Sequence, residues 1–463
     1  PGGRAAVFRQ DGFTFDAGPT IVTAPFLFDE LWALCGRRRE DDVELRWLDP
    51  FYKLRFDDGS TFTCRADAEA MADEVARLSP DDVAGYKRFM QVSERMYRLG
   101  FDPLADKPFD TLWDMARILP LLIRMRADRS VWGLACKHVR DPRLRLALSF
   151  HPLFVGGDPL RATAFYSMVS FLERQWGVSF AMGGTGALVT GLVGLIEGAG
   201  DRVRCDAPVA EILLAGGASG RPRARGVRLE NGEEIAADIV VSNADSGSTY
   251  RKLLPPSARK VWSDRAIDRT RFSMSLVVWY FGTNRRYEDV EHHTIVLGPR
   301  YEDLLRDIFR RKVLADDFSL YLHRPTKTDP SLAPEGCDAF YVLSPVPNLE
   351  ADVDWETAAE PYRRRIEQRL SETVLPGLER HVVSSKMITP LDFRDRLSSE
   401  QGAAFGVEPI LTQMAWFRPH NRSEDVDGLY LVGAGSHPGA GLPGVLCSAK
   451  VLDRVTPHAS ELV

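Results

Sequence analysis

The chain has 463 residues, which exceeds the usual size of one hydrophobic core and predicts at least two lobes. Its composition, 44% hydrophobic and 27% charged, is that of a globular protein, and the formal net charge of -6 argues against nucleic-acid binding. The six cysteines form no C-x-x-C pair and no zinc-like spacing, so we expect reduced thiols in a reducing cytoplasm, no disulfide framework and no metal site.

The first segments predict short strands, turns and one helix. After a glycine-rich opening, PGGR, alternating apolar residues predict a strand within residues 12–19 that ends in a Gly-Pro corner. Asp16 before this corner is either a simple turn residue or part of a site. Helical spacing follows over residues 25–36, and a hairpin across Asp58-Gly59 is expected in residues 51–62.

The next region predicts a helical cap. Residues 67–99 are charged and helical in spacing, and residues 111–145 interleave bulky apolar side chains with eight Lys or Arg and three Asp. The second segment therefore has a local net charge of +5 in an acidic chain. This composition is typical of helices that lie on an anionic membrane surface, although a helical cap with a solvated basic face would have the same pattern.

Two runs without charged residues, 175–196 and 429–449, are rich in glycine. The second also contains Pro438 and Pro443, so we predict no transmembrane helix. A strand is expected at residues 176–180, and Thr185 is expected to cap a helix that continues to residue 195. Glu173 and Arg174 are candidate site residues, and a surface ion pair is the simpler interpretation of both.

The middle of the chain predicts two β regions. Residues 202–244 predict strands that include a type I′ hairpin across Asn231-Gly232, and residues 271–281, 318–323 and 339–345 predict a second, mostly antiparallel sheet. That sheet would form the floor of a substrate cavity, with four candidate lining residues: Trp279, Phe281, Tyr321 and Tyr341. His292-His293 has no third ligand at a matching interval and predicts a polar strand edge.

The most informative stretch is LYLVGAGSHPGAGLPGVLCSAK, residues 429–450. A short buried strand is expected at its start, and residues 444–455 predict a helix with Pro443 at the first helical position. The free N–H groups and positive dipole end of that helix would suit an electron-rich ring or a phosphate. A turn without a ligand is the alternative, but five glycines in 12 residues carry an entropic cost that favours a ligand close to the backbone.

This stretch closely resembles the C-terminal flavin motif of the bacterial carotenoid desaturases, the phytoene desaturase group within the amine-oxidase-like flavoproteins. The family's pattern is a strand, then G-A-G-T-H-P-G-A-G-I-P-G-V and a helix, from which Ser436 and Leu442 depart. The resemblance covers essentially the whole chain. It includes FDAGP at residues 15–19, FVGGDP at 154–159, VSNAD at 241–245 and WFRPHNR at 416–422.

The resemblance implies an α/β fold with a Rossmann-like FAD-binding lobe, a second antiparallel-sheet substrate domain and a helical cap. It assigns residues 1–65, 176–250 and 411–463 to the FAD-binding lobe, with the substrate domain starting in the first of these. Residues 66–175 would form a membrane-contacting cap and residues 251–410 the substrate domain. The family's first βαβ unit, with its G-x-G-x-x-G turn and ribose-binding Glu, is expected in the roughly 30 residues before Pro1, so we expect a fragment of a longer gene product.

The resemblance also implies FAD as the cofactor and a small set of site residues. The D-M-x-R match makes Asp114 and Arg117 candidates for proton transfer, with an ion pair on the helix surface as the alternative. The implied FAD contacts lie in the opening turn, the Gly-Pro corner, the first β region and the C-terminal motif: Gly2, Gly3, Arg4, Gly18, Pro19, Val209, Asn243, Gly433, Ala434, Gly435, Gly444 and Val445.

The implied reaction is the desaturation of phytoene, in which FAD accepts a hydride and the neighbouring carbon loses a proton. Three or four steps would give neurosporene or lycopene. Phytoene and other C40 carotenoid intermediates would be the substrates, a quinone or oxygen the electron acceptor, and the location cytoplasmic, peripherally associated with the inner membrane. The alternatives are a related desaturase of another polyene, a flavin amine oxidase and a non-catalytic lipid-binding fragment.

Overall fold

The largest sheet joins strands from distant parts of the chain. The computed structural model describes residues 1–217 and 220–461. Seven strands pair in the order β15-β11-β14-β13-β12-β4-β5, and only the pairing of β12 with β4 is parallel within this sheet. The prediction of a mostly antiparallel sheet is thereby confirmed. Its strands are β4 (Tyr52–Arg55), β5 (Thr61–Cys64), β11 (Ser275–Thr283), β12 (His293–Val296), β13 (Leu320–His323), β14 (Asp338–Val346) and β15 (Val382–Ile388).

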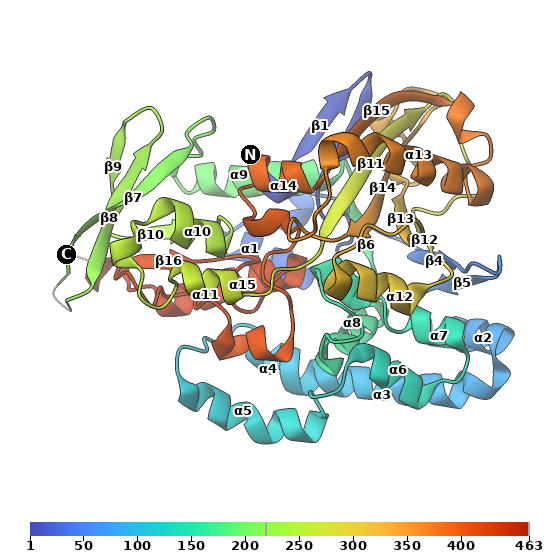
Figure 1. The fold of residues 1–463 in the computed structure, drawn as a ribbon, viewed down its shortest axis with the longest axis horizontal. Helices are drawn as coiled ribbons and strands as arrows, with labels where there is room; N and C mark the ends of the chain where they lie inside the picture. The colour runs from blue at the N-terminus through green and yellow to red at the C-terminus, as the bar shows by residue number, and fades with distance from the viewer. Residues whose placement is uncertain (218–219, 462–463) are drawn as a thin grey trace.

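A second group of strands holds the glycine-rich C-terminal segment. Strand β10 (Val240–Ser242) lies parallel to β16 (Leu429–Leu431), and β16 leads toward helix α15 (Leu442–Val455). Beside them, at the left of Figure 1, stands the antiparallel sheet of β7 (Val209–Gly216), β8 (Pro222–Leu229) and β9 (Glu234–Ala236). The β8–β9 hairpin turns at Asn231-Gly232 as predicted, but the predicted type I′ turn is wrong, because only Gly232 has a positive φ (87°) and a type I′ turn needs it at both residues. The result is a mixed α/β fold, as expected.

The cap is helical and occupies the lower half of Figure 1. Its helices are α2 (Ala68–Leu78), α3 (Val83–Met96), α4 (Asp102–Leu104), α5 (Leu112–Met125), α6 (Val131–His138), α7 (Pro142–Ala147) and α8 (Met168–Trp176). Local sequence sets their ends: the Asp67 side chain accepts N–H bonds from Glu69 and Ala70, and Arg126 ends α5 in a left-handed conformation. The prediction of helices in this region is confirmed.

The remaining elements connect these parts. They are β1 (Val7–Gln10), β2 (Phe13–Asp16), β3 (Leu45–Trp47), β6 (Ser179–Ala181), α1 (Phe26–Leu34), α9 (Thr185–Gly198), α10 (Ser246–Leu253), α11 (Asp264–Arg269), α12 (Tyr301–Arg306), α13 (Trp355–Thr373) and α14 (Pro390–Arg396). Within the described ranges, none of the helices combines the length and apolar composition that a bilayer crossing needs.

Candidate active site

A cavity of about 1660 Å³ lies where the cap, the large sheet and the glycine-rich segment meet. This volume exceeds the 300–1,000 Å³, in round figures, of a typical small-molecule pocket, so the cavity has room for more than one ligand. Most of the predicted cofactor residues line it: Gly2, Gly3, Arg4, Gly18, Pro19, Asn243, Gly433, Ala434, Gly444 and Val445. Val209, which is exposed at the start of β7, and Gly435 are not among the described lining residues.

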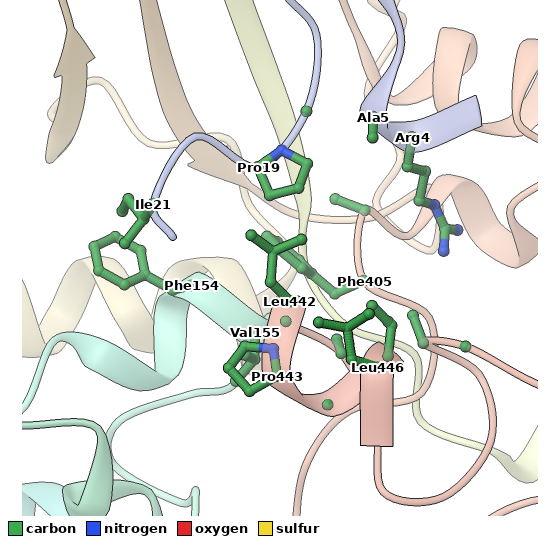
Figure 2. Close-up of a pocket in the computed structure, with 18 of the residues that line it drawn as sticks. Arg4, Ala5, Pro19, Ile21, Phe154, Val155, Phe405, Leu442, Pro443 and Leu446 are labelled. Carbon is green, nitrogen blue, oxygen red and sulfur yellow. The ribbon is translucent and has the colours of Figure 1, made fainter. Parts of the chain in front are cut away.

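The first turn of α15 forms one wall of the cavity (Figure 2). Gly441 precedes the helix at a φ of 94°, a conformation that favours glycine, and the helix begins at Leu442 rather than at Gly444 as predicted. Pro443 occupies the first turn, where its missing N–H is not needed. The positive end of the helix dipole therefore meets the cavity, an arrangement that suits an electron-rich ring or an anion.

Close packing between protein segments also explains why two residues of this segment are glycine. A Cβ atom at Gly433 would lie 2.4 Å from Asn243 Nδ2, and one at Gly435 would lie 2.8 Å from Ser246 Oγ. Both positions thus let β16 and the chain after β10 approach each other closely. These contacts give the two glycines a structural reason of their own, and the expectation of a ligand near the backbone stays a prediction there.

Polar groups gather at the end of the cavity beside the opening turn. Arg4 donates to Ser399 Oγ at 2.6 Å and lies 3.8 Å from Asp245 Oδ2. Within the described residues, Arg4 Nε and Asp245 Oδ2 are buried without a hydrogen-bond partner. Burial also raises the pKa of the Asp245 carboxyl. A ligand that carries both donors and acceptors would satisfy this end of the cavity.

Asp16, at the cavity wall, directly supports the start of helix α9. Its Oδ1 accepts the backbone N–H of Thr185 at 2.7 Å, and burial raises the pKa of its carboxyl to about 6. Thr185 was expected to cap this helix, but the residue before the helix is Gly184, and the Thr185 hydroxyl bonds Pro19 O at 2.8 Å instead. Asp16 is therefore more than a turn residue, because it connects the Gly-Pro corner to α9.

The large sheet gives the cavity its apolar wall. Alternate residues of β11 face it, namely Leu276, Val278 and Tyr280, together with Tyr321 and Tyr341 from the neighbouring strands. Tyr321 and Tyr341 were predicted as lining and are confirmed. Trp279 and Phe281 were also predicted and are wrong, because they lie on the opposite face in a core cluster shared with α13.

Glu173 lies in the cavity wall on helix α8 and is 3% exposed. One carboxylate oxygen accepts the Tyr52 hydroxyl at 2.8 Å, and the other lies 3.0 Å from His151 Nε2. The surface ion pair suggested for Glu173 and Arg174 is therefore wrong for Glu173. The buried partners of Glu173 come from segments more than 20 residues away, which local sequence does not reveal.

His292 and His293 are buried and do not form a polar strand edge, so that prediction is wrong. A third imidazole, His323, comes from β13, where it stands opposite His293 in the strand register. The potential ligand nitrogens of the three residues lie within 4.8 Å of one another. His323 Nε2 is 3.0 Å from His292 Nε2, and Tyr321 bonds His293 Nδ1 at 2.7 Å, so the cluster extends the hydrogen bonding behind the cavity wall.

The two candidate proton-transfer residues lie on α5. Asp114 forms a capping box with Thr111 at the start of this helix, and Arg117 is exposed. Their neighbours Met115, Ile118 and Leu122 line the cavity, whereas neither Asp114 nor Arg117 is among the described lining residues. Their catalytic role stays a prediction that the geometry does not favour.

Comparison with known proteins identifies the family. A family model described as flavin containing amine oxidoreductase matches residues 1–450. The chain belongs to this family. The fold of the flavin containing amine oxidoreductases is also seen in solved structures: an oxidoreductase from Methanosarcina mazei matches with a TM-score of 0.62 and 15% identity, covering 98% of this chain and 91% of that one. A variant of putrescine oxidase matches with a TM-score of 0.62 and 12% identity, covering 99% and 90%.

Within the family, the chain is most informatively compared with curated relatives. It is 50% identical to the phytoene desaturase (neurosporene-forming) of Cereibacter sphaeroides, with 99% of this chain and 88% of the relative covered. It is 44% identical to the phytoene desaturase (lycopene-forming) of Pantoea ananas, with 97% and 91% covered.

The cofactor of this flavin-containing family fits the cavity. FAD carries a ring that gains negative charge when it is reduced and an anionic pyrophosphate, and the cavity presents the start of α15 and the partly unpartnered Arg4 to such groups. Figure 2 shows the opening turn, with Arg4 and Ala5, and the Gly-Pro corner, with Pro19, near the start of α15. FAD is the cofactor of the protein.

Proposed function

We propose that the protein is an FAD-dependent phytoene desaturase that introduces successive conjugated double bonds and forms neurosporene or lycopene. Two relatives with these activities in their names match nearly the whole chain. The observation that carries the proposal is the large cavity, in which the residues that fit FAD and the apolar sheet wall face the same space.

A hydrocarbon substrate offers no hydrogen-bond handle, so the site must recognise it by shape and by apolar burial. Side chains such as Leu276, Val278 and Leu343 supply that surface. The Tyr341 hydroxyl bonds Thr20 Oγ1 at 2.7 Å, which leaves the ring to face the cavity while its polar atom is satisfied by the protein. These residues would hold the polyene and exclude water.

When bound, the oxidised flavin accepts a hydride from a methylene beside the conjugated system. The neighbouring carbon then loses a proton, and the electron pair of that second C–H bond becomes the new double bond. The protein must hold the two carbons in position and receive the proton. Residues from the opening turn, the Gly-Pro corner and the start of α15 would hold the cofactor: Gly2, Gly3, Arg4, Gly18, Pro19, Asn243, Ala434, Gly444 and Val445.

We also propose that helix α5 docks on the membrane and admits the substrate. It lies at the outer edge of the cap (Figure 1) and exposes four large apolar side chains, Leu112, Trp113, Leu119 and Ile123. Its inner side chains Met115, Ile118 and Leu122 line the cavity. A helix with apolar residues on both an outer and a cavity side, flanked by Arg117 and Arg124, suits the boundary between an anionic bilayer and a tunnel for lipid.

Vesicle sedimentation tests the membrane proposal. The double substitution Trp113→Ser and Ile123→Ser is expected to reduce the fraction of protein that sediments with anionic vesicles at least tenfold. Val383→Ser is the matched control, because Val383 is also half exposed but lies on β15 in the large sheet. Equal sedimentation of the double variant and the control would contradict docking through α5.

The enzyme proposal is tested by product analysis. The protein expressed from its whole gene is loaded with FAD and incubated without oxygen with phytoene in liposomes, with and without a quinone, and pigments are extracted. Absorption bands of a longer polyene are expected, and a quinone that increases their yield would identify the electron acceptor. Unchanged phytoene, or turnover of amines in its place, would contradict the proposal.

A further inference from the structure

Glu173, His151 and Tyr52 form a buried cluster that the proposed FAD contacts leave unused. They are 3%, 5% and 0% exposed, and they come from α8, from the turn at residues 151–155 and from β4. Glu173 accepts the Tyr52 hydroxyl on Oε1 and faces His151 Nε2 with Oε2. His151 Nδ1 is buried and has no hydrogen-bond partner in the part of the chain that the structure describes.

The carboxylate of Glu173 differs from the other buried carboxylates of the cavity wall. Asp16 caps α9, and Asp245 caps α10 and faces Arg4. Within the described residues, the ionic partner of Glu173 is His151, whose charge depends on its own protonation. The pair therefore has the capacity to take up a proton, which a carboxylate held by an arginine lacks.

The pair lies close to the segments that would hold the flavin. Both Glu173 and His151 line the cavity. The centroid of the Phe154 ring is 6.3 Å from that of the His151 ring and 5.9 Å from that of the Tyr321 ring. Figure 2 shows Phe154 beside Ile21 and its neighbour Val155 beside Pro443, at the start of α15.

We propose that His151 accepts the proton of each desaturation step and that Glu173 is its positioning residue. The inference deepens the proposed function and rests on it. An ionised carboxylate can only accept hydrogen bonds, so Glu173 holds the hydrogen of His151 on Nε2 and leaves the lone pair on Nδ1. The hydride goes to the bound flavin, the proton goes to Nδ1, and the pair changes from a single negative charge to a neutral ion pair.

This change of charge favours the transfer. A lone negative charge in a wall of apolar rings is poorly solvated, whereas a contacting cation and anion stabilise each other. Asp114, the candidate from the family motif, is not among the described lining residues, and its Oδ2 accepts the backbone N–H and the hydroxyl of Thr111. The geometry therefore favours the pair over the motif residue.

Single-turnover kinetics test the inference. FAD-loaded His151→Gln, Glu173→Gln and unmodified protein are mixed without oxygen with phytoene in micelles, and the bleaching of flavin absorbance is followed from pH 5 to 9. His151→Gln is expected to slow bleaching by roughly 10²–10⁴-fold and to remove the fall in rate toward acid pH. Glu173→Gln is expected to slow flavin bleaching and to shift the pH at which the rate falls, because the tautomer of His151 is no longer fixed.

Two further measurements separate chemistry from folding. The FAD content per protein and the phytoene affinity of both variants are expected to equal those of the parent. Glu173→Asp, which keeps the charge but shortens the side chain, is expected to bleach at an intermediate rate. Glu94→Gln is the matched control, because Glu94 pairs with Arg98 on α3 and is not among the described lining residues.

The outcomes are distinguishable. Parental rates and an unchanged pH profile in both His151→Gln and Glu173→Gln would overturn the inference. So would a loss of rate in Asp114→Asn alone. If phytoene does not bleach the flavin of the unmodified protein at any pH, the proposed function is overturned, and with it the role of the His151–Glu173 pair.

Discussion

Strand β11 presents one set of side chains to helix α13 and the alternate set to the cavity, and the two faces of the large sheet differ in chemistry. Toward α13 lie Val277, Trp279 and Phe281, packed with α13 side chains such as Ile366 and Leu370 in a core cluster. Toward the cavity, the tyrosines of β13 and β14 combine aromatic rings with hydroxyl groups that the protein satisfies.

The difference shows how one sheet serves two purposes. The face toward α13 stabilises the fold by burying apolar surface, and its side chains are closely packed. The cavity face must leave space for a substrate, so its residues are held by hydrogen bonds as well as by packing. The Thr20 hydroxyl bonds Tyr341 at 2.7 Å and Tyr321 at 3.3 Å, and Tyr321 in turn bonds His293. We therefore expect substitutions on the first face to affect stability and those on the second to affect the reaction.

Trp279→Ala is expected to have the largest effect. The indole is fully buried, stacks on Phe281 with ring centroids 4.2 Å apart and donates to Ser385 Oγ at 2.8 Å. Its loss should lower the free energy of unfolding by about 3–5 kcal/mol. Urea unfolding at saturating FAD measures this, and a loss below about 1 kcal/mol would contradict the assignment of Trp279 to a close-packed core.

His293→Gln is expected to change how stability depends on pH. Burial lowers the pKa of His293 to about 3, below the value of about 6.5 in the unfolded chain, so the unfolded state takes up the proton first as pH falls. The stability that neutral His293 gives the folded protein is therefore fully present above pH 6.5 and is lost as the pH falls below it. Between pH 6.5 and 5, the stability advantage of the parent over His293→Gln should shrink by about 2 kcal/mol.

Thermal unfolding at a series of pH values measures this change. His458→Gln, in the exposed C-terminal segment, is the matched control and should give a curve parallel to that of the parent. A constant difference between the parent and His293→Gln over this range would show that His293 is not buried as described.

Val277→Ala and Val278→Ala form a matched pair, because these neighbours lie on opposite faces of β11. Val277→Ala should cost about 2 kcal/mol of unfolding free energy, and Val278→Ala about half of that, since Val278 already borders open space. Val278→Trp, by contrast, should leave stability nearly unchanged and slow phytoene turnover by filling the cavity. Equal effects of the two alanine substitutions on both stability and turnover would remove the distinction between the faces.

Tyr341→Phe is expected to have the smallest effect. It removes the hydroxyl that bonds Thr20 Oγ1 but keeps the ring in the cavity wall. The expected loss is about 1 kcal/mol of stability with little change in turnover, because the substrate contacts the ring. A large loss of turnover with unchanged FAD content would instead show that the hydroxyl takes part in the reaction.

The sequence predicted the elements better than the contacts between them. Alternation marked β11, β13 and β14 as strands, and the helix after the C-terminal glycines was predicted, although it begins two residues earlier than expected. Alternation divides a strand into two faces but does not say which face meets the cavity, so Trp279 and Phe281 were assigned to the wrong one. That choice depends on where α13 packs, which is set by long-range contacts.

The site was predictable where it rests on local backbone. Ten of the 12 cofactor residues that the family resemblance implied line the cavity, because the motifs that carry the resemblance are short contiguous stretches of the sequence. Glu173 and His323 left no such signal. Glu173 meets Tyr52 from 121 residues away, and His323 meets His292 from 31 residues away through the pairing of two strands.

The most direct test of the account is a crystal structure of the FAD-loaded protein with a saturated C40 analogue of phytoene, which cannot react. The account predicts the flavin ring against Pro19, Gly444 and Val445, and the hydrocarbon along Val278, Tyr280 and Tyr341 within the same cavity. Hydrocarbon density on the α13 side of the sheet, or a flavin ring separated from the start of α15, would contradict it.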